Sequence, residues 1–142
     1  MPRPVLIIET DALCLSALSF MVLSLGFRPV PLSSSREVCA TLGQLDRAPA
    51  ALITEFEVNS PCEARCLIAS IRQRYADLPI IVLTADTSHA AREALETLDC
   101  HVLFKPSRPE DILRLLPRGD EAAAEDPAET LQDRFNTAAL KR

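Results

Sequence analysis

The chain of 142 residues has no run that is both free of charge and long enough to cross a bilayer. Residues 12–27 carry no charge, but a membrane-spanning helix needs about 20 apolar residues. Glu9 and Asp11 directly precede this run, whereas the leading region of a signal peptide is basic. We therefore expect a cytoplasmic protein that makes no contact with a membrane.

The sequence also lacks an excess of positive charge. It contains 20 acidic and 15 basic residues, for a net charge of −5, and its only lysines are Lys105 and Lys141. Nucleic-acid binding draws most of its affinity from Lys and Arg placed on phosphates. We therefore expect no nucleic-acid partner.

Cysteine and glycine patterns exclude several further classes of protein. Five cysteines at irregular spacings do not form a disulfide framework, and Cys62 and Cys66 have no second pair of ligands for a metal. No G-x-S-x-G motif is present, which excludes an α/β hydrolase. A flavin-binding relative of flavodoxin would need a phosphate-binding loop where this chain has the acidic segment 9–11.

Short apolar runs alternate with helical stretches along the chain. Runs that are apolar without alternation indicate strands buried on both faces, and hence a parallel sheet covered by helices on both sides. Pro29 and Pro31 each remove a backbone donor, so their strand belongs at an edge, as in the flavodoxin-like order 2-1-3-4-5. The pattern predicts strands over 5–8, 28–32, 50–54, 79–84 and 101–104, and helices over 12–25, 34–45, 62–75, 88–98 and 108–116, with Ser33–Ser35 and Ser107 as caps.

The predicted α/β domain covers residues 1–116 and is followed by a C-terminal helical extension. Residues 117–126 contain Pro, Gly and several acids, which is typical of a linker. Asp126 and Pro127 can begin a helix over 127–142. Leu131 and Phe135 follow at helical spacing, so this helix is predicted to be amphipathic.

Polar side chains gather where four of the predicted strands end. Glu9, Thr10 and Asp11 follow the first strand, and Glu55 follows the third. The fourth ends at Thr84 and the fifth at Lys105 and Pro106. Because the carboxyl ends of parallel strands meet at one edge, these side chains should lie together. Carboxylates can hold Mg²⁺, while Thr and Lys can contact phosphoryl oxygens.

The segments VLIIETDALCLSALSFMVLSLGF, PAALITEF, PIIVLTA and HVLFKP resemble, in this order, the first, third, fourth and fifth strand regions of response-regulator receiver domains. The resemblance runs from about Arg3 to Leu116 and implies a CheY-like fold. It implies that a sensor histidine kinase passes a phosphoryl group to an Asp at the end of the third strand, with Mg²⁺ held by neighbouring acids. Phosphorylation in this family changes the partners that the domain binds.

The sequence departs from that family at its centre. Glu55 stands where the family has the phosphoaccepting Asp, and Thr10 replaces one acid of the metal-binding pair. The aromatic residue expected three before the Lys is Val102. We expect no catalytic residue and no bound metal, Glu9, Asp11 and Glu55 being the only residual ligands for Mg²⁺.

We therefore predict a stand-alone pseudo-receiver, a single-domain response regulator that is not an enzyme, needs no cofactor and signals by protein contacts. We expect it to belong to a two-component phosphorelay and to bind a sensor histidine kinase or another signalling protein. The alternative is a receiver that is phosphorylated on Glu55 with the help of Mg²⁺.

The uncharged helix over 12–25 predicts a partner surface. We assign Leu13, Ala17, Leu18, Met21, Val22 and Leu25 to its core side, and Leu15, Phe20 and Leu23 to its outer side. Exposed apolar patches usually mark interfaces. We expect a homodimer that uses this helix or Leu131 and Phe135 of the tail; the alternative is a tail folded back on its own domain.

Overall fold

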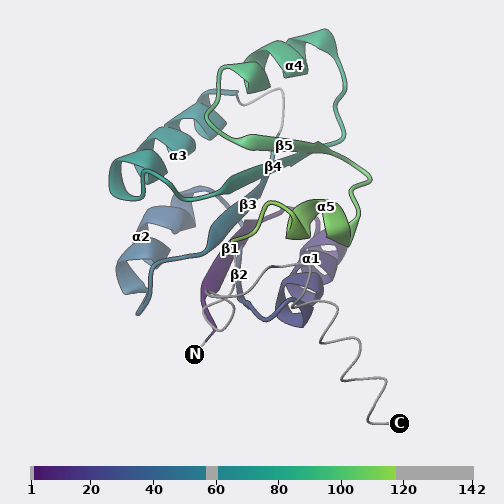
Figure 1. Ribbon diagram of the computed structural model, residues 1–142. Helices are drawn as coiled ribbons and strands as arrows, with labels where there is room; N and C mark the ends of the chain where they lie inside the picture. The colour runs from purple at the N-terminus through teal and green to yellow at the C-terminus, as the bar shows by residue number, and fades with distance from the viewer. Residues whose placement is uncertain (1, 57–60, 118–142) are drawn as a thin grey trace, which may run out of the picture.

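The computed structural model describes residues 2–56 and 61–117. It contains a parallel sheet of five strands in the order β2-β1-β3-β4-β5, which confirms the flavodoxin-like prediction (Figure 1). The predicted linker beyond Pro117 and the predicted helix over 127–142 lie outside the described residues. The elements are β1 (Pro4–Ile8), α1 (Ala12–Ser24), β2 (Arg28–Leu32), α2 (Arg36–Gln44), β3 (Ala51–Glu55), α3 (Pro61–Arg74), β4 (Ile80–Thr84), α4 (His89–Glu96), β5 (His101–Phe104) and α5 (Pro109–Leu113).

The two prolines of β2 lie at an edge of the sheet, where they cost no ladder hydrogen bond. The backbone N–H of Arg28 donates to the carbonyl of Arg3, 2.9 Å away, just before β1 begins. Because N–H groups alternate in direction along a strand, the nitrogens of Pro29 and Pro31 face the open edge. The sequence of β2 is therefore compatible only with the terminal position that it occupies.

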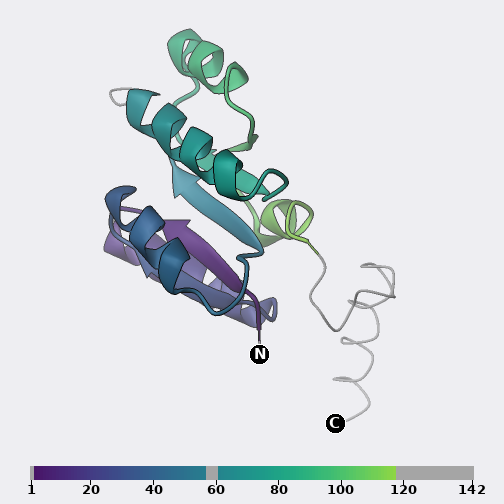
Figure 2. The ribbon, with the colours of Figure 1, turned by 90° about the vertical axis from the view of Figure 1, so that its left-hand side faces the viewer.

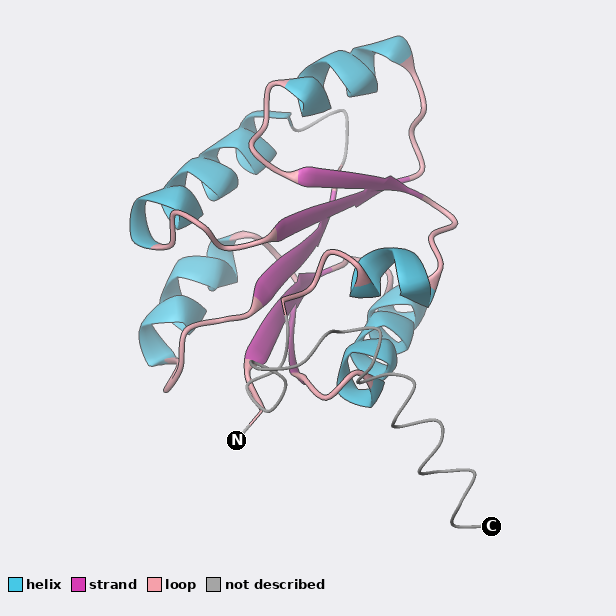
Figure 3. Cartoon of the chain, viewed as in Figure 1, coloured by secondary structure: helices cyan, strands magenta, loops and turns pink. Residues whose placement is uncertain are grey.

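Helices cover both faces of the sheet, and each face has its own core (Figures 2 and 3). On one face, α2, α3 and α4 contribute Val38, Ile71 and Leu95 to a cluster with strand residues such as Leu52. On the other face, α1 and α5 pack Val22 and Ile112 against alternate residues of the same strands. Since successive strand side chains point to opposite faces, both cores consist of uninterrupted apolar strands.

The orientation predicted for α1 is wrong for three residues. Leu15 was expected on the outer side, but it is half-buried and packs against the core cluster around Val22. Leu13 and Ala17 were expected in the core, but both are exposed. Leu13, Ala17 and Phe20 follow one another at spacings of four and three, which place them on one side of a helix. An error in assigning this stripe arises easily because α1 has no charged residue, and its few serines give little contrast between its sides.

Two predicted helix starts also differ from the structure. Ser35 precedes α2 without capping it through its side chain, and Ser33 instead donates its hydroxyl to Glu37, 3.0 Å away. Arg108, not Ser107, precedes α5, and its backbone N–H donates to the Asp111 carboxylate, 3.0 Å away. In both cases a carboxylate in the first turn of the helix accepts a hydrogen bond from a residue that precedes the helix. None of the helices in the described part of the chain is long and apolar enough to span a membrane.

Arg72 of α3 joins the two loops that lead into β4 and β5. Its guanidinium donates to the carbonyls of Ala76 and Leu78 and, at 2.9 Å, to that of Asp99. Its Nε lies 3.0 Å from the Asp99 carboxylate, close enough for an ion pair but not aligned for a hydrogen bond. One side chain therefore hydrogen-bonds to carbonyls on two segments that are distant in sequence.

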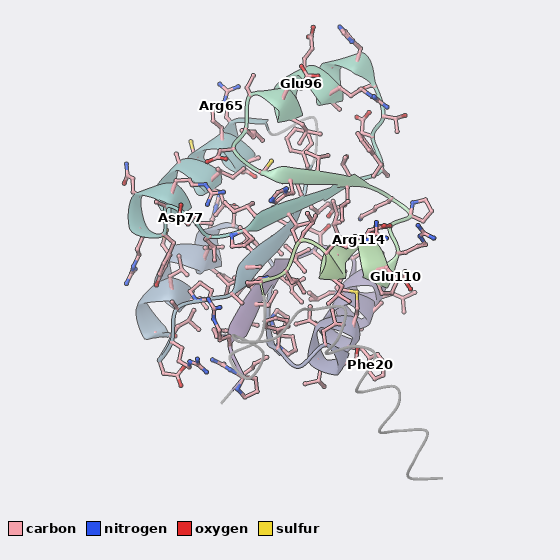
Figure 4. All side chains as sticks on the ribbon, viewed as in Figure 1. Phe20, Arg65, Asp77, Glu96, Glu110 and Arg114 are labelled. Atoms are coloured by element: carbon pink, nitrogen blue, oxygen red, sulfur yellow. The ribbon has the colours of Figure 1, made fainter. Side chains whose placement is uncertain are left out.

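Substitution of Arg72 by Met should lower the free energy of unfolding by about 1–3 kcal/mol, because it removes these hydrogen bonds, one of them partly buried, while keeping most of the side-chain volume. Urea denaturation measures the change. Arg65→Met, on the exposed side of the same helix, is the matched control and should change stability by less than about 0.5 kcal/mol (Figure 4). Equal effects of the two substitutions would contradict this role of Arg72.

Candidate functional site

Glu9, directly after β1, is a buried carboxylate with two partners. It exposes only 3% of its surface. The Asp11 backbone N–H donates to its Oε1 over 3.2 Å, and the Lys105 ammonium donates to its Oε2 over 3.2 Å. A carboxylate so deeply buried requires such compensation, because an unpaired buried charge is strongly destabilising.

Glu55, the last residue of β3, reaches the same ammonium from the neighbouring strand. Its Oε1 lies 3.6 Å from the Lys105 Nζ, and its Oε2 accepts a hydrogen bond of 3.1 Å from the Thr10 hydroxyl. The side chain of Glu55 remains 25% exposed, so this pair borders solvent. Both carboxylate oxygens of Glu55 therefore face a donor within its own chain.

Lys105, directly after β5, carries the single positive charge that both carboxylates share. Burial opposes its charged form, but the hydrogen bond and the charge of Glu9, together with the charge of Glu55, outweigh burial and raise the pKa of Lys105. The ammonium is consequently fully protonated at neutral pH. The cluster of Glu9, Glu55 and Lys105 has a net charge of −1 when both acids are ionised.

Several effects act in opposite directions on the pKa of Glu55. Partial burial raises it, whereas hydrogen bonding with Glu9 and Thr10 and the charge of Lys105 lower it, and the net result is a pKa below the ordinary value of 4.5. Glu55 is thus ionised at neutral pH. The carboxylate and the ammonium form a stable pair in the resting protein.

Asp11, Thr84 and Pro106 lie at the same edge of the sheet but have other local roles. Asp11 is the N-cap of α1, and its carboxylate accepts the Cys14 N–H over 2.9 Å, a contact that lowers the pKa of Asp11. The buried Thr84 hydroxyl accepts the Asp86 N–H over 3.0 Å. Pro106 follows Lys105 through a cis peptide bond. The structure thus brings Glu9, Thr10, Glu55 and Lys105 into direct contact, with Thr84 beside them in the sheet.

The donor set does not fit a divalent cation. Residues 2–56 and 61–117 contain no group of three or more His, Cys, Asp or Glu side chains placed to hold a metal ion. Asp11 is engaged in capping α1, and the ammonium of Lys105 lies between the other two carboxylates. Hard cations such as Mg²⁺ require several free oxygen ligands in a near-octahedral arrangement. In this arrangement Lys105 supplies the positive charge that the two acids require.

Two features of the site were missed by the sequence prediction. Thr10 was regarded only as a lost acid, yet its hydroxyl donates to Glu55. A cavity of about 310 Å³ lies beside this bond, between the segment Ser33–Arg36 and Leu67 of α3. The serines were expected only as helix caps, and nothing in their spacing indicates that they line a cavity.

Comparison with known proteins shows the same architecture in solved structures. A chemotaxis protein of Vibrio cholerae, CheY4, is 18% identical with a TM-score of 0.65, over 80% of this chain and 95% of that one. A response regulator receiver protein from Sinorhizobium medicae is 16% identical with a TM-score of 0.68, over 81% and 91% of the two chains. One from Pseudomonas putida is 23% identical with a TM-score of 0.63, over 81% and 95%. No family model and no curated protein matches the sequence.

The protein therefore has the fold of the receiver domains of response regulators. Its polar cluster lies at the carboxyl ends of β1, β3 and β5, the edge at which open parallel sheets carry their sites.

Replacement of Glu55 by Gln tests the electrostatics of the cluster. Because the pKa of Glu55 is lower in the folded than in the unfolded chain, its ionised form contributes stability above pH 4.5. The contribution, less than about 1 kcal/mol for this partly exposed pair, disappears as the pH falls through the folded pKa. Urea midpoints of wild type and Glu55→Gln should therefore differ at pH 7 and converge on acidification.

Glu96→Gln, at an exposed position on α4, is the control for that measurement (Figure 4). It should leave the midpoint unchanged across the same pH range. A gap between wild type and Glu55→Gln that widens as the pH falls would show that the pKa of Glu55 is raised rather than lowered.

Proposed function

We propose that the protein is a response regulator of a two-component phosphorelay that acts in the cytoplasm as a pseudo-receiver. Such a domain is not phosphorylated, catalyses no reaction and signals through protein contacts. The observation that carries the proposal is the ion pairing of Lys105 with both Glu9 and Glu55. The resemblance assigns Lys105 to contact with a phosphoryl group, but here the chain's own carboxylate takes that place.

The length of the Glu55 side chain argues against phosphoryl transfer. Compared with the Asp that the resemblance implies, Glu moves the carboxylate outward by about 1.5 Å. Misplacement of a nucleophile by about 1 Å can cost roughly a hundredfold in rate. Thr10 on one oxygen and Lys105 near the other further hold this carboxylate in place.

The charge of Glu55 supports a domain that is fixed in one state. An ionised Glu carries a permanent charge of about −1, whereas a phosphoryl group would bring roughly −1.5 to −2. Lys105 therefore always has an anionic partner, independent of any kinase. Val102, half-buried among apolar residues of β4 and α4, replaces the aromatic side chain that the resemblance leads us to expect there. We therefore propose that this pocket does not switch.

The alternative is a receiver that accepts a phosphoryl group on Glu55 with Mg²⁺ as cofactor. It would require Glu55 to leave both of its donors and Lys105 to leave the space between the carboxylates. The arrangement of carboxylate acceptors around Lys105 favours the pseudo-receiver.

Acetyl phosphate with Mg²⁺ distinguishes these two functions. The wild-type chain should take up no phosphoryl label, as measured by intact-protein mass and radiolabel. The double variant Glu55→Asp/Thr10→Asp shortens the acceptor and restores the acidic pair, so its labelling rate should rise by about a hundredfold or more above background.

The same chemical changes at an exposed site provide the control. Glu96→Asp/Thr97→Asp lies at the end of α4 and should remain unlabelled. Stable label on Glu55 of the wild-type chain would disprove the pseudo-receiver and support the alternative.

A protein that signals by contact needs a contact surface, and α1 supplies one. Its apolar stripe consists of Leu13, Ala17, Phe20 and Leu23, all exposed. We propose that a sensor histidine kinase or another signalling protein binds this surface, that a second copy of the chain does so in a homodimer, and that no nucleic acid is bound. Exposed apolar side chains on a helix free of charge favour protein partners.

Light scattering of the full chain at tens of micromolar should therefore give the mass of a dimer. Phe20→Ser should weaken dimerisation by about tenfold or more, because exposed aromatic residues often dominate interfaces. Phe104→Ser removes the exposed aromatic residue of β5 and is the control that should leave the dimer intact. A monomeric wild-type chain would rule out self-association.

A further inference from the structure

The apolar stripe of α1 holds three of the four large apolar side chains that are exposed in the described part of the chain. Leu13, Phe20 and Leu23 are 81%, 74% and 60% exposed, and α1 contains no charged residue. The Phe20 ring projects away from the body of the domain (Figure 4). A helix that is apolar on all sides is normally buried all round. The side around Val22 is buried against the sheet, so the opposite side requires a second cover.

We propose that the cover is the segment 127–142 of a second copy, so that each copy places its C-terminal segment on the apolar stripe of the other. The inference deepens the homodimer proposed above and rests on it. The contact joins two unlike surfaces, the stripe and the segment, and each copy contributes one of each. A twofold symmetric dimer makes such a contact twice.

The stripe alone is too small for a stable dimer. A helix of the length of α1 is about 20 Å long and about 10 Å across, so one side of it covers about 200 Å². Stable protein interfaces bury about 800 Å² on each partner. Packing of one stripe against another would therefore leave most of the required area unaccounted for. Each copy must contribute further apolar surface.

The segment 127–142 has the sequence that such a contact needs. Its apolar residues Leu131, Phe135 and Ala139 recur at every fourth position, which predicts one apolar side in a helix about 24 Å long. That length matches α1. The acidic and basic residues of the segment fall mainly outside this side, so an uncharged stripe suits it better than a charged surface would.

The described part of the chain ends beside α1. Leu116 belongs to the core cluster that contains Val22 of α1, and α5 lies beside α1 (Figure 1). From Pro117, the residues up to 126 can extend over about 30 Å. The segment can therefore start beside its own α1 and reach the stripe of a second copy that packs against it.

Four full-length chains test the assignment by sedimentation velocity and light scattering. Phe20→Ser damages the stripe, and Leu131→Ser/Phe135→Ser damages the segment. Asn136→Ser/Thr137→Ser changes the other side of the predicted helix and is the matched control. We expect the wild type and the control to be dimers, and both damaged variants to self-associate at least about tenfold more weakly. Far-ultraviolet circular dichroism verifies that every variant is folded.

Mixing the two damaged variants isolates the contact between unlike surfaces. The Phe20→Ser chain keeps an intact segment, and the Leu131→Ser/Phe135→Ser chain keeps an intact stripe. One of the two contacts can therefore form only between the two different chains. We expect the mixture to associate at least about tenfold more tightly than either variant alone.

The remaining outcomes overturn the proposal in separate ways. A dimer that survives Leu131→Ser/Phe135→Ser would show that the homodimer exists but does not use the segment. A mixture no tighter than its components would exclude the exchange of unlike surfaces. A wild-type chain that is monomeric would exclude the homodimer itself, and with it the exchange of segments between two copies.

Discussion

The ion pairing of Lys105 with Glu9 and Glu55 is the interaction on which the polar edge of the sheet depends. Glu9 is buried, so it must have a positive partner, and β5 delivers that partner from the far side of the sheet. Glu55 then shares the ammonium from β3, which lies between them. Three strands distant in sequence are thus joined by one charge.

In the pseudo-receiver that we propose, Glu55 supplies Lys105 with a permanent anion at the place where the resemblance would put a phosphoryl group. The electrostatic requirement of the buried carboxylate and of the ammonium is met within the chain. In such a domain the function that we propose depends on the surfaces that bind partners rather than on the pocket.

The fold could be predicted almost completely from the sequence, because strands such as β4 carry an unbroken apolar run, here over 80–83, and Pro29 and Pro31 restrict β2 to an edge. The strand ends also identified Glu9, Glu55 and Lys105. The Thr10 hydrogen bond could not be predicted, since it depends on the reach of a side chain from a neighbouring strand. The orientation of α1 was missed because a helix without polar residues on one side gives no contrast between core and surface.

That missing contrast is itself informative about α1. In an amphipathic helix such as α4, charged residues lie on the side opposite the buried one, so the sequence shows which side is buried. The sequence of α1 contains no charged residue that could show this. Burial of Leu15 and Val22 satisfies only the side that faces the sheet. Leaving Leu13 and Phe20 in water gains nothing for the folded monomer, because their apolar surface is exposed in both the folded and the unfolded chain. The composition of this side suits the contact outside the domain that we propose, just as the composition of the polar edge suits a contact within it.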